Sequence, residues 1–201
     1  MPHDISLTDH ELHILQDTDF LRTKARALSK VEVLLTRTRE ALESVVADSS
    51  LYFPHGARLA GGKIARGENY RGLPYRVLDQ PALLTADDIF AFRTMFWWGH
   101  FFSATLHLQG LSLERYRNGL MDQLEELAAG GLYLSVGPTP WEYHYGRDNY
   151  VLIQPAHRAH LERCSFLKLS RRLELGEWKR LPEFAAASLH GLLGQLSAAA
   201  R

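Results

Sequence analysis

Residues 88–110, DIFAFRTMFWWGHFFSATLHLQG, form a long aromatic and largely apolar run that restricts what the chain can fold into. The run is long enough to cross a membrane. However, Arg93 and His100 lie inside it, and an arginine at the centre of a membrane helix costs about 2.5–3.5 kcal/mol. Phenylalanine, tryptophan and threonine also favour strands over helices. We therefore expect a β-hairpin here and no membrane span.

The turn of this hairpin is expected at residues 99–100, because glycine in the first position suits a two-residue type II′ turn. Such a turn pairs Trp98 with Phe101 and sorts the side chains onto two faces. Arg93 then lies on an otherwise apolar core face, whereas His107 lies on a face that mixes aromatic and polar groups. This second face is expected to be either a binding platform or core covered by the C-terminal helices.

Elsewhere, the spacing of apolar residues predicts mostly helices and antiparallel strands. A long N-terminal helix is expected from Phe20 to about Ala47, after an earlier helix start at Thr8, where Glu11 has capping-box spacing. We further expect strands at 74–79 and 132–136, a hairpin at 141–154, and helices at 112–131, 158–173 and 182–196.

These elements predict one α+β domain over residues 1–201. The expected fold is a mainly antiparallel sheet of five to six strands, with a long N-terminal helix, a middle helix and C-terminal helices packed on it. Its order, α-β3-α-β2/3-α, is similar to the α-β3-α-β2-α arrangement of type III secretion chaperones. No motif accompanies this resemblance, so it implies a fold and no function.

The charges of the chain are balanced, because 23 Lys and Arg residues face 23 Asp and Glu residues. A neutral chain has no overall field that attracts nucleic acid or an anionic membrane, so we expect neither as a partner. The single cysteine, Cys164, excludes an intrachain disulfide, and the first residues lack the basic and apolar regions of a secretory signal. We expect a soluble, cytoplasmic protein and leave a homo-oligomer open.

Residues 55–76 are rich in glycine and in basic residues and show no clear period, which predicts a long loop. Glycines let backbone N–H groups approach an anion, and arginine can bind phosphate or carboxylate through two hydrogen bonds. The stretch GGKI is not a P-loop, because Ile64 replaces the Ser or Thr that would hold magnesium. The alternative is a solvated loop whose cations pair with the protein's own acids. The cations are Arg58, Lys63, Arg66, Arg71 and Arg76.

Arginine, aromatic and histidine side chains complete the candidate site. If Arg93 is buried, it needs an anionic ligand or an internal carboxylate such as Glu142, and we favour the internal pair. Stacked aromatic rings suit flat ligands, and a histidine can act as a general base near neutral pH. The alternative is that the aromatic side chains are simply core. The candidates are Trp98, Trp141 and Tyr143 for ligand binding, and His107 and His144 for catalysis.

No metal site, cofactor or covalent catalyst is predicted. The histidine pairs at 10/13 and 157/160 have helical spacing, but neither has a nearby cysteine or carboxylate set. Cys164 lies in an apolar context and is expected to be a small core residue. The chain contains neither an HExxH nor a GxSxG motif.

Two functions remain as hypotheses. The first is a non-enzymatic binding module for a protein partner or a small anionic ligand, which uses the glycine- and arginine-rich loop beside the aromatic sheet face. The second is a small metal-independent enzyme with His107 or His144 as its base and Arg93 or Arg71 as its anion holder. The absence of a catalytic motif favours the first.

Overall fold

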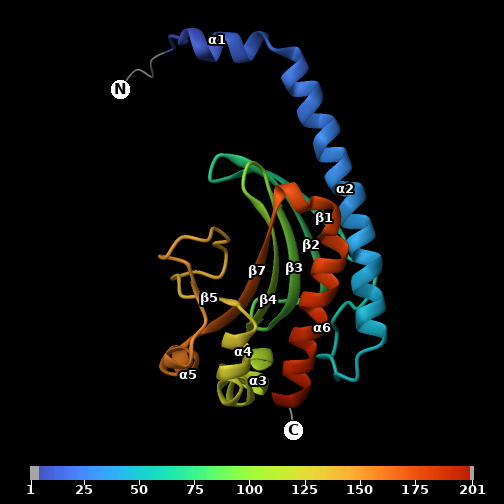
Figure 1. Ribbon diagram of the computed structural model, residues 1–201, viewed down its shortest axis with the longest axis vertical. Coiled ribbons are helices and arrows are strands. Elements are labelled where there is room, and N and C mark those ends of the chain that lie inside the picture. Colours follow the sequence, from blue (N-terminus) through green and yellow to red (C-terminus); the bar gives the residue numbers. More distant parts are fainter. Residues whose placement is uncertain (1–4, 200–201) are drawn as a thin grey trace.

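The computed structural model of the chain describes residues 5–199 (Figure 1). Its α-helices are α1 (Asp9–Gln16), α2 (Thr18–Ala47), α3 (Leu111–Asp122), α4 (Leu124–Ala129), α5 (Arg158–Arg163) and α6 (Leu181–Ala199). Its strands are β1 (Ile64–Tyr70), β2 (Leu73–Leu84), β3 (Ile89–Trp97), β4 (Phe101–Gln109), β5 (Tyr133–Ser135), β6 (Tyr150–Leu152) and β7 (Phe166–Glu174). Short 3₁₀ segments span Pro155–His157 and Leu175–Arg180.

The predicted α+β class is confirmed. The sheet is antiparallel throughout, in the order β1-β2-β3-β4-β7-β5-β6, and it has seven strands rather than the expected five or six. Four strands precede the middle helices and one strand follows α5. The element order therefore departs from the α-β3-α-β2-α pattern of type III secretion chaperones.

The N-terminal helices form where the sequence predicts them. Thr8 and Glu11 make the reciprocal hydrogen bonds of a capping box at the start of α1. Asp17 then caps α2 by accepting a hydrogen bond from the backbone N–H of Phe20, and α2 continues unbroken for 30 residues. The middle helix is also confirmed, although it breaks at Gln123 into α3 and α4.

The register of the β3–β4 hairpin differs by one residue from the prediction. Trp97 pairs with Phe101, and the turn contains three residues, with Gly99 in the left-handed conformation at φ 74°. A shift by one residue moves every β4 side chain to the other face. The observed register gathers the large apolar residues of both strands on one face, which buries more apolar surface than the predicted pairing. These residues are Phe90, Phe92, Phe96, Phe102, Leu106 and Leu108.

The predicted loop at residues 55–76 is largely a β-hairpin. β1 pairs with β2 from Ile64 to Tyr70, and Arg71 and Gly72 form the turn with φ values of 51° and 80°. Turns of this kind need positive φ at both central residues, and arginine is an unusual residue there. Because the side chains of β1 are mostly polar and exposed, its sequence shows no clear alternation of apolar and polar residues, and the strand could not be recognised from it.

Two predictions for the C-terminal half are wrong. Residues 141–145 form no strand, because β6 pairs with β5 instead. Residues 166–174 are strand β7 and not the second half of a helix. In β7 the apolar residues Leu167, Leu169 and Leu173 alternate with polar ones, and pairing along the whole of β4 uses this period of two. The final helix, α6, is confirmed.

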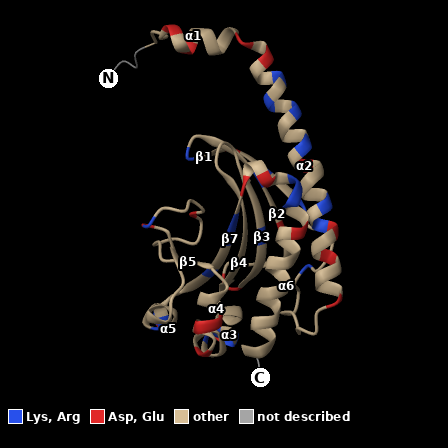
Figure 2. Ribbon diagram, in the orientation of Figure 1, with Lys and Arg blue, Asp and Glu red and all other residues tan. Residues whose placement is uncertain are grey.

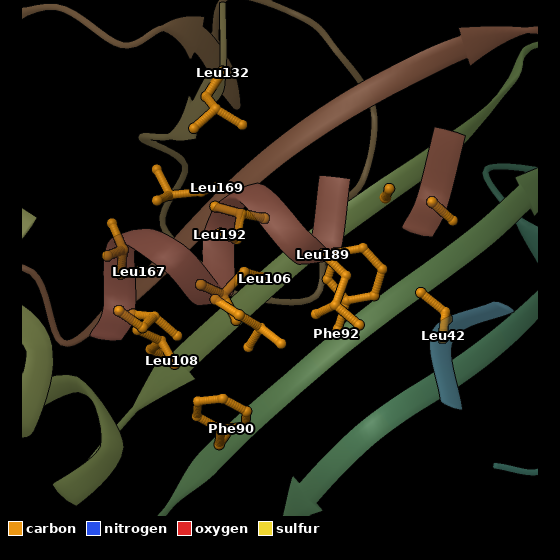
Figure 3. Close-up of a cluster of buried hydrophobic side chains, with 14 of the residues drawn as sticks. Leu42, Phe90, Phe92, Leu106, Leu108, Leu132, Leu167, Leu169, Leu189 and Leu192 are labelled. Atoms are coloured by element: carbon orange, nitrogen blue, oxygen red, sulfur yellow. The ribbon is translucent and has the colours of Figure 1, made fainter. Parts of the chain in front are cut away.

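The sheet has two different faces. We call the face covered by α2 and α6 the helix face, and the opposite face, which carries the segment 136–149 between β5 and β6, the loop face (Figure 1). On the helix face, Phe92 and Leu106 from the sheet meet Leu42 of α2 and Leu189 of α6 in the hydrophobic core (Figure 3). Within residues 5–199, no helix is both long and apolar enough to cross a membrane.

Candidate functional site

A row of polar side chains crosses the loop face of the sheet. The register places Asp79, Arg93, Thr105, Ser170 and Tyr133 side by side on β2, β3, β4, β7 and β5. Residues paired in this way point to the same face. The segment 136–149 covers the row (Figure 1), so most of these polar groups are enclosed between sheet and segment.

Arg93 is held by an internal carboxylate, in the way the sequence analysis favours. Its Nε and one terminal nitrogen donate to the two oxygens of Asp79 at 2.7 and 2.8 Å, and another nitrogen donates to the hydroxyl of Tyr143. The partner is therefore Asp79 and not Glu142. Arg93 lies on the loop face, and the register shift places Thr105 and His107 of β4 on that face with it. The Arg93 guanidinium also lies over the rings of Tyr143 and Trp141.

Lys168 of β7 lies beside this pair and is fully buried, with 0% of its surface exposed. Its Nζ donates hydrogen bonds to the backbone carbonyl oxygens of Pro140, at 2.9 Å, and of Glu142. It also lies 4.2 Å from the centre of the Tyr143 ring. Among the described residues, Lys168 has no carboxylate within ion-pair distance. Burial, together with the charge of Arg93, lowers the pKa of Lys168 to about 7.

His107, a predicted catalytic candidate, pairs with Lys168 across β4 and β7. Its Nε2 is buried and has no hydrogen-bond partner in the described part of the chain. Burial and the nearby charges of Lys168 and Arg93 lower the pKa of His107 to about 3. The ring is therefore neutral at physiological pH and is a weak base.

His144, the other catalytic candidate, belongs to a second cluster near the β1–β2 turn. Its Nδ1 lies 3.1 Å from Glu142, and its Nε2 lies 3.1 Å from Asp148 and 3.2 Å from Arg71. The hydroxyl of Tyr70 donates to Glu142 at 2.9 Å. These contacts fasten the segment 136–149 to the turn. Arg71, a predicted ligand-binding residue, has the same role here.

Most of the other cations of the predicted anion loop already contact acceptor groups within the chain. Arg66 and the buried Arg76 both contact Glu32 of α2, at 2.7 and 3.0 Å. Arg58 donates to a backbone carbonyl. Lys63 is exposed, and no ion pair forms to it in residues 5–199. Two of the five loop cations, Arg66 and Arg76, thus join β1 and β2 to α2.

An exposed apolar arm at the N-terminus is a feature that sequence reasoning missed. We define the arm as residues 5–21, which comprise α1 and the first turn of α2 and extend beyond the sheet (Figure 1). α1 has no buried residue, and the side chains of Leu15 and Leu21 are 66% and 59% exposed. Helical spacing shows which apolar residues share one face of a helix, but it cannot show whether another element covers that face. The exposed apolar residues are Ile5, Leu7, Leu12, Ile14, Leu15, Phe20 and Leu21.

A groove of about 580 Å³ lies beside the arm, between α2, the β3–β4 turn and the segment Leu175–Arg180. Its floor is apolar and includes Trp98, Phe102 and Trp178. The groove continues along α2 as a second hollow of about 390 Å³, which shares Lys30 and Trp178 with the first. Trp98, a predicted ligand-binding residue, is thus separated by the sheet from Arg93, Trp141 and Tyr143.

The structure therefore divides the predicted site residues among different places. Arg93, Trp141, Tyr143 and His107 meet on the loop face, whereas Trp98 lies in the groove. No pattern in the sequence joined Lys168 to the first group. Compared with protein-family models, curated proteins and solved structures, the chain matches none.

Proposed function

We propose that the protein is a binding module for a protein partner and that the arm is its contacting element. The observation that carries this proposal is the exposure of the arm's apolar side chains, together with the absence of any buried residue in α1. Exposed apolar surface of this kind typically marks an interaction site. A helix of eight residues is also marginal in water by itself, so α1 gains most from a partner that covers its apolar side.

Site-specific photo-crosslinking tests this proposal. A benzophenone amino acid at Leu15 is expected to give a discrete adduct in an extract of the source cells. The same group at Leu111, which is equally exposed but lies at the start of α3, is the matched control. An adduct at position 15 that disappears with Phe20→Ser supports the proposal. Equal labelling from both positions contradicts it.

The geometry gives less support to the enzyme hypothesis. A general base is most effective when its pKa lies near the working pH. The pKa of His107 is about 3, far below that range. His144 is enclosed by Glu142, Asp148 and Arg71, which together contact both of its ring nitrogens.

A small anionic ligand is a second candidate, because Lys168 is a buried cation without a carboxylate partner. Burying a charge is costly unless a group of opposite charge compensates it. A carboxylate or phosphate could accept hydrogen bonds from Lys168 in place of the carbonyl oxygens of the segment 136–149. It could also take the place of the Tyr143 hydroxyl at Arg93. The segment would have to move aside for this exchange.

Calorimetric titration with inorganic phosphate and acetate separates this candidate from the predicted anion loop. Binding at Lys168 should be strongest below pH 7 and should weaken above it, since the amine then loses its charge. Lys168→Met should abolish the binding, whereas Lys63→Met should not. Loss of binding in Lys63→Met alone would instead assign the anion to the β1–β2 region. No heat with either anion would remove this candidate.

A further inference from the structure

The groove beside the arm has the composition expected of a surface that receives an apolar, acidic helix. Its floor is formed by aromatic and aliphatic side chains, and its rim carries four cations but no acidic residue among the lining side chains. Two of these cations, Arg26 and Lys30, line the hollow nearest the arm. The others are Arg37 and Lys179.

The arm is the complement of this groove in both respects. Residues 5–21 contain four acids and no Lys or Arg, whereas residues 22–39 contain six Lys or Arg and one acid. Figure 2 shows this division along the helices, with red at α1 and at the start of α2 and blue further along α2. Leu12 and Leu15 expose apolar surface next to the acids Asp9 and Glu11. An acidic apolar helix therefore lies next to a basic apolar groove in the same chain.

The connection between the helices prevents the arm from filling its own groove. Only Asp17 separates Gln16, the last residue of α1, from Thr18, the first residue of α2. Two antiparallel helices need a connection of about two to five residues. α1 cannot fold back along α2 unless turns of one helix unwind. Consistent with this, α1 points away from α2 (Figure 1).

We propose that the arm of one copy of this chain binds in the groove of a second copy, and that the exchange is mutual. The inference rests on the proposed function and names its partner. A two-fold dimer repeats each contact, so one complementary pair of surfaces provides two interfaces. Apolar side chains such as Leu15 would cover the aromatic floor, while the acids of α1 would face Lys30 and Arg26, the latter already 3.9 Å from Asp19 of its own chain. Because each arm reaches the groove of the other chain, the contact closes as a two-fold dimer and does not continue into a filament.

The first test is the mass of the purified full-length chain, measured by sedimentation over a range of concentrations. We expect twice the 22.8 kDa of a single chain, with dissociation on dilution. The double variant Leu15→Ser/Leu21→Ser should weaken association at least tenfold with an unchanged circular dichroism spectrum. Leu111→Ser removes an equally exposed leucine outside the arm and should have no effect. A wild-type chain that stays monomeric at every concentration overturns the inference.

Charge exchange gives a sharper test, because it identifies which surfaces meet. Asp9→Lys reverses an acid of the arm, and Lys30→Glu reverses a cation of the groove. Asp19 and Arg26 are left unchanged, because they already lie 3.9 Å apart within one chain. Neither variant should associate alone, since both interfaces of each homodimer would bring like charges together. Mixed together, the two variants should form a heterodimer, in which every arm again meets a groove of opposite charge. A dimer that survives both reversals, or a mixture that stays monomeric, contradicts the proposed contact.

The two proposals can fail separately. If the purified chain is monomeric but Leu15 is crosslinked to a different protein, the second copy is wrong and the arm remains a protein-binding element. If neither experiment gives a specific product, both proposals are wrong.

Discussion

At the scale of single residues, Arg93 and Asp79 make the clearest energetic prediction. Their side chains are only 16% and 13% exposed and share two hydrogen bonds. Arg93→Leu should destabilise the fold by about 3–5 kcal/mol, because it leaves Asp79 charged and enclosed. Arg66→Leu is the matched control: this arginine is also paired, with Glu32, but it is 67% exposed and should cost less than about 1 kcal/mol. Urea unfolding of both variants measures the difference, and equal losses would contradict the prediction.

Lys168 makes a prediction about pH. Its pKa is lowered from 10.5 to about 7 in the folded chain, so between these values the unfolded chain binds more protons than the folded one. The free energy of unfolding therefore rises with pH through this window, and the cost of the buried charge is fully present below pH 7. Lys168→Met should remove this rise. The comparison is made by urea unfolding between pH 7 and 9, and Lys168→Met keeps every tyrosine, so tyrosine ionisation affects both proteins alike. Parallel curves for the two proteins would show that Lys168 keeps its ordinary pKa.

At the scale of elements, two helical glycines should respond in opposite directions to the same change. A Cβ added at Gly194 of α6 meets no atom within 4 Å, so Gly194→Ala should stabilise the helix by about 0.5–1 kcal/mol. A Cβ at Gly119 of α3 would lie 2.3 Å from the backbone of Ala199. Gly119→Ala should therefore push α3 and α6 apart and lower the melting temperature. Stabilisation by both substitutions would show that the contact between these helices is loose.

At the scale of the whole molecule, stability should be distributed unevenly. β3, β4 and β7 lie in the centre of the sheet and pair along their full lengths, whereas α1 has no buried residue. In dilute protein we expect the backbone amides of α1 to exchange with solvent fastest and those of β4 slowest. If the arm binds a second copy, protection of α1 should increase with protein concentration while that of β4 stays constant. Protection of α1 equal to that of β4 at high dilution would mean that the chain covers its own arm.

The sequence by itself determined the elements whose signal is local. Helix α2 follows from its apolar period and from the cap at Asp17, and the hairpin at residues 88–110 follows from its aromatic composition. The α+β class and the internal pairing of Arg93 could also be predicted, because a charge among apolar residues needs a partner wherever it is buried.

Only the tertiary structure decided which residues meet. The β3–β4 register is the one that buries more apolar surface. Strand β7 forms because its backbone pairs with the free edge of β4. Lys168 was expected in a helix, and its place beside Arg93 and His107 results from that pairing. The arm was predicted as helix, but its exposure could not be predicted, because it depends on whether any other element packs against it. Periodicity is a property of a segment, whereas burial is a property of the whole fold, and this protein's candidate surfaces depend on burial.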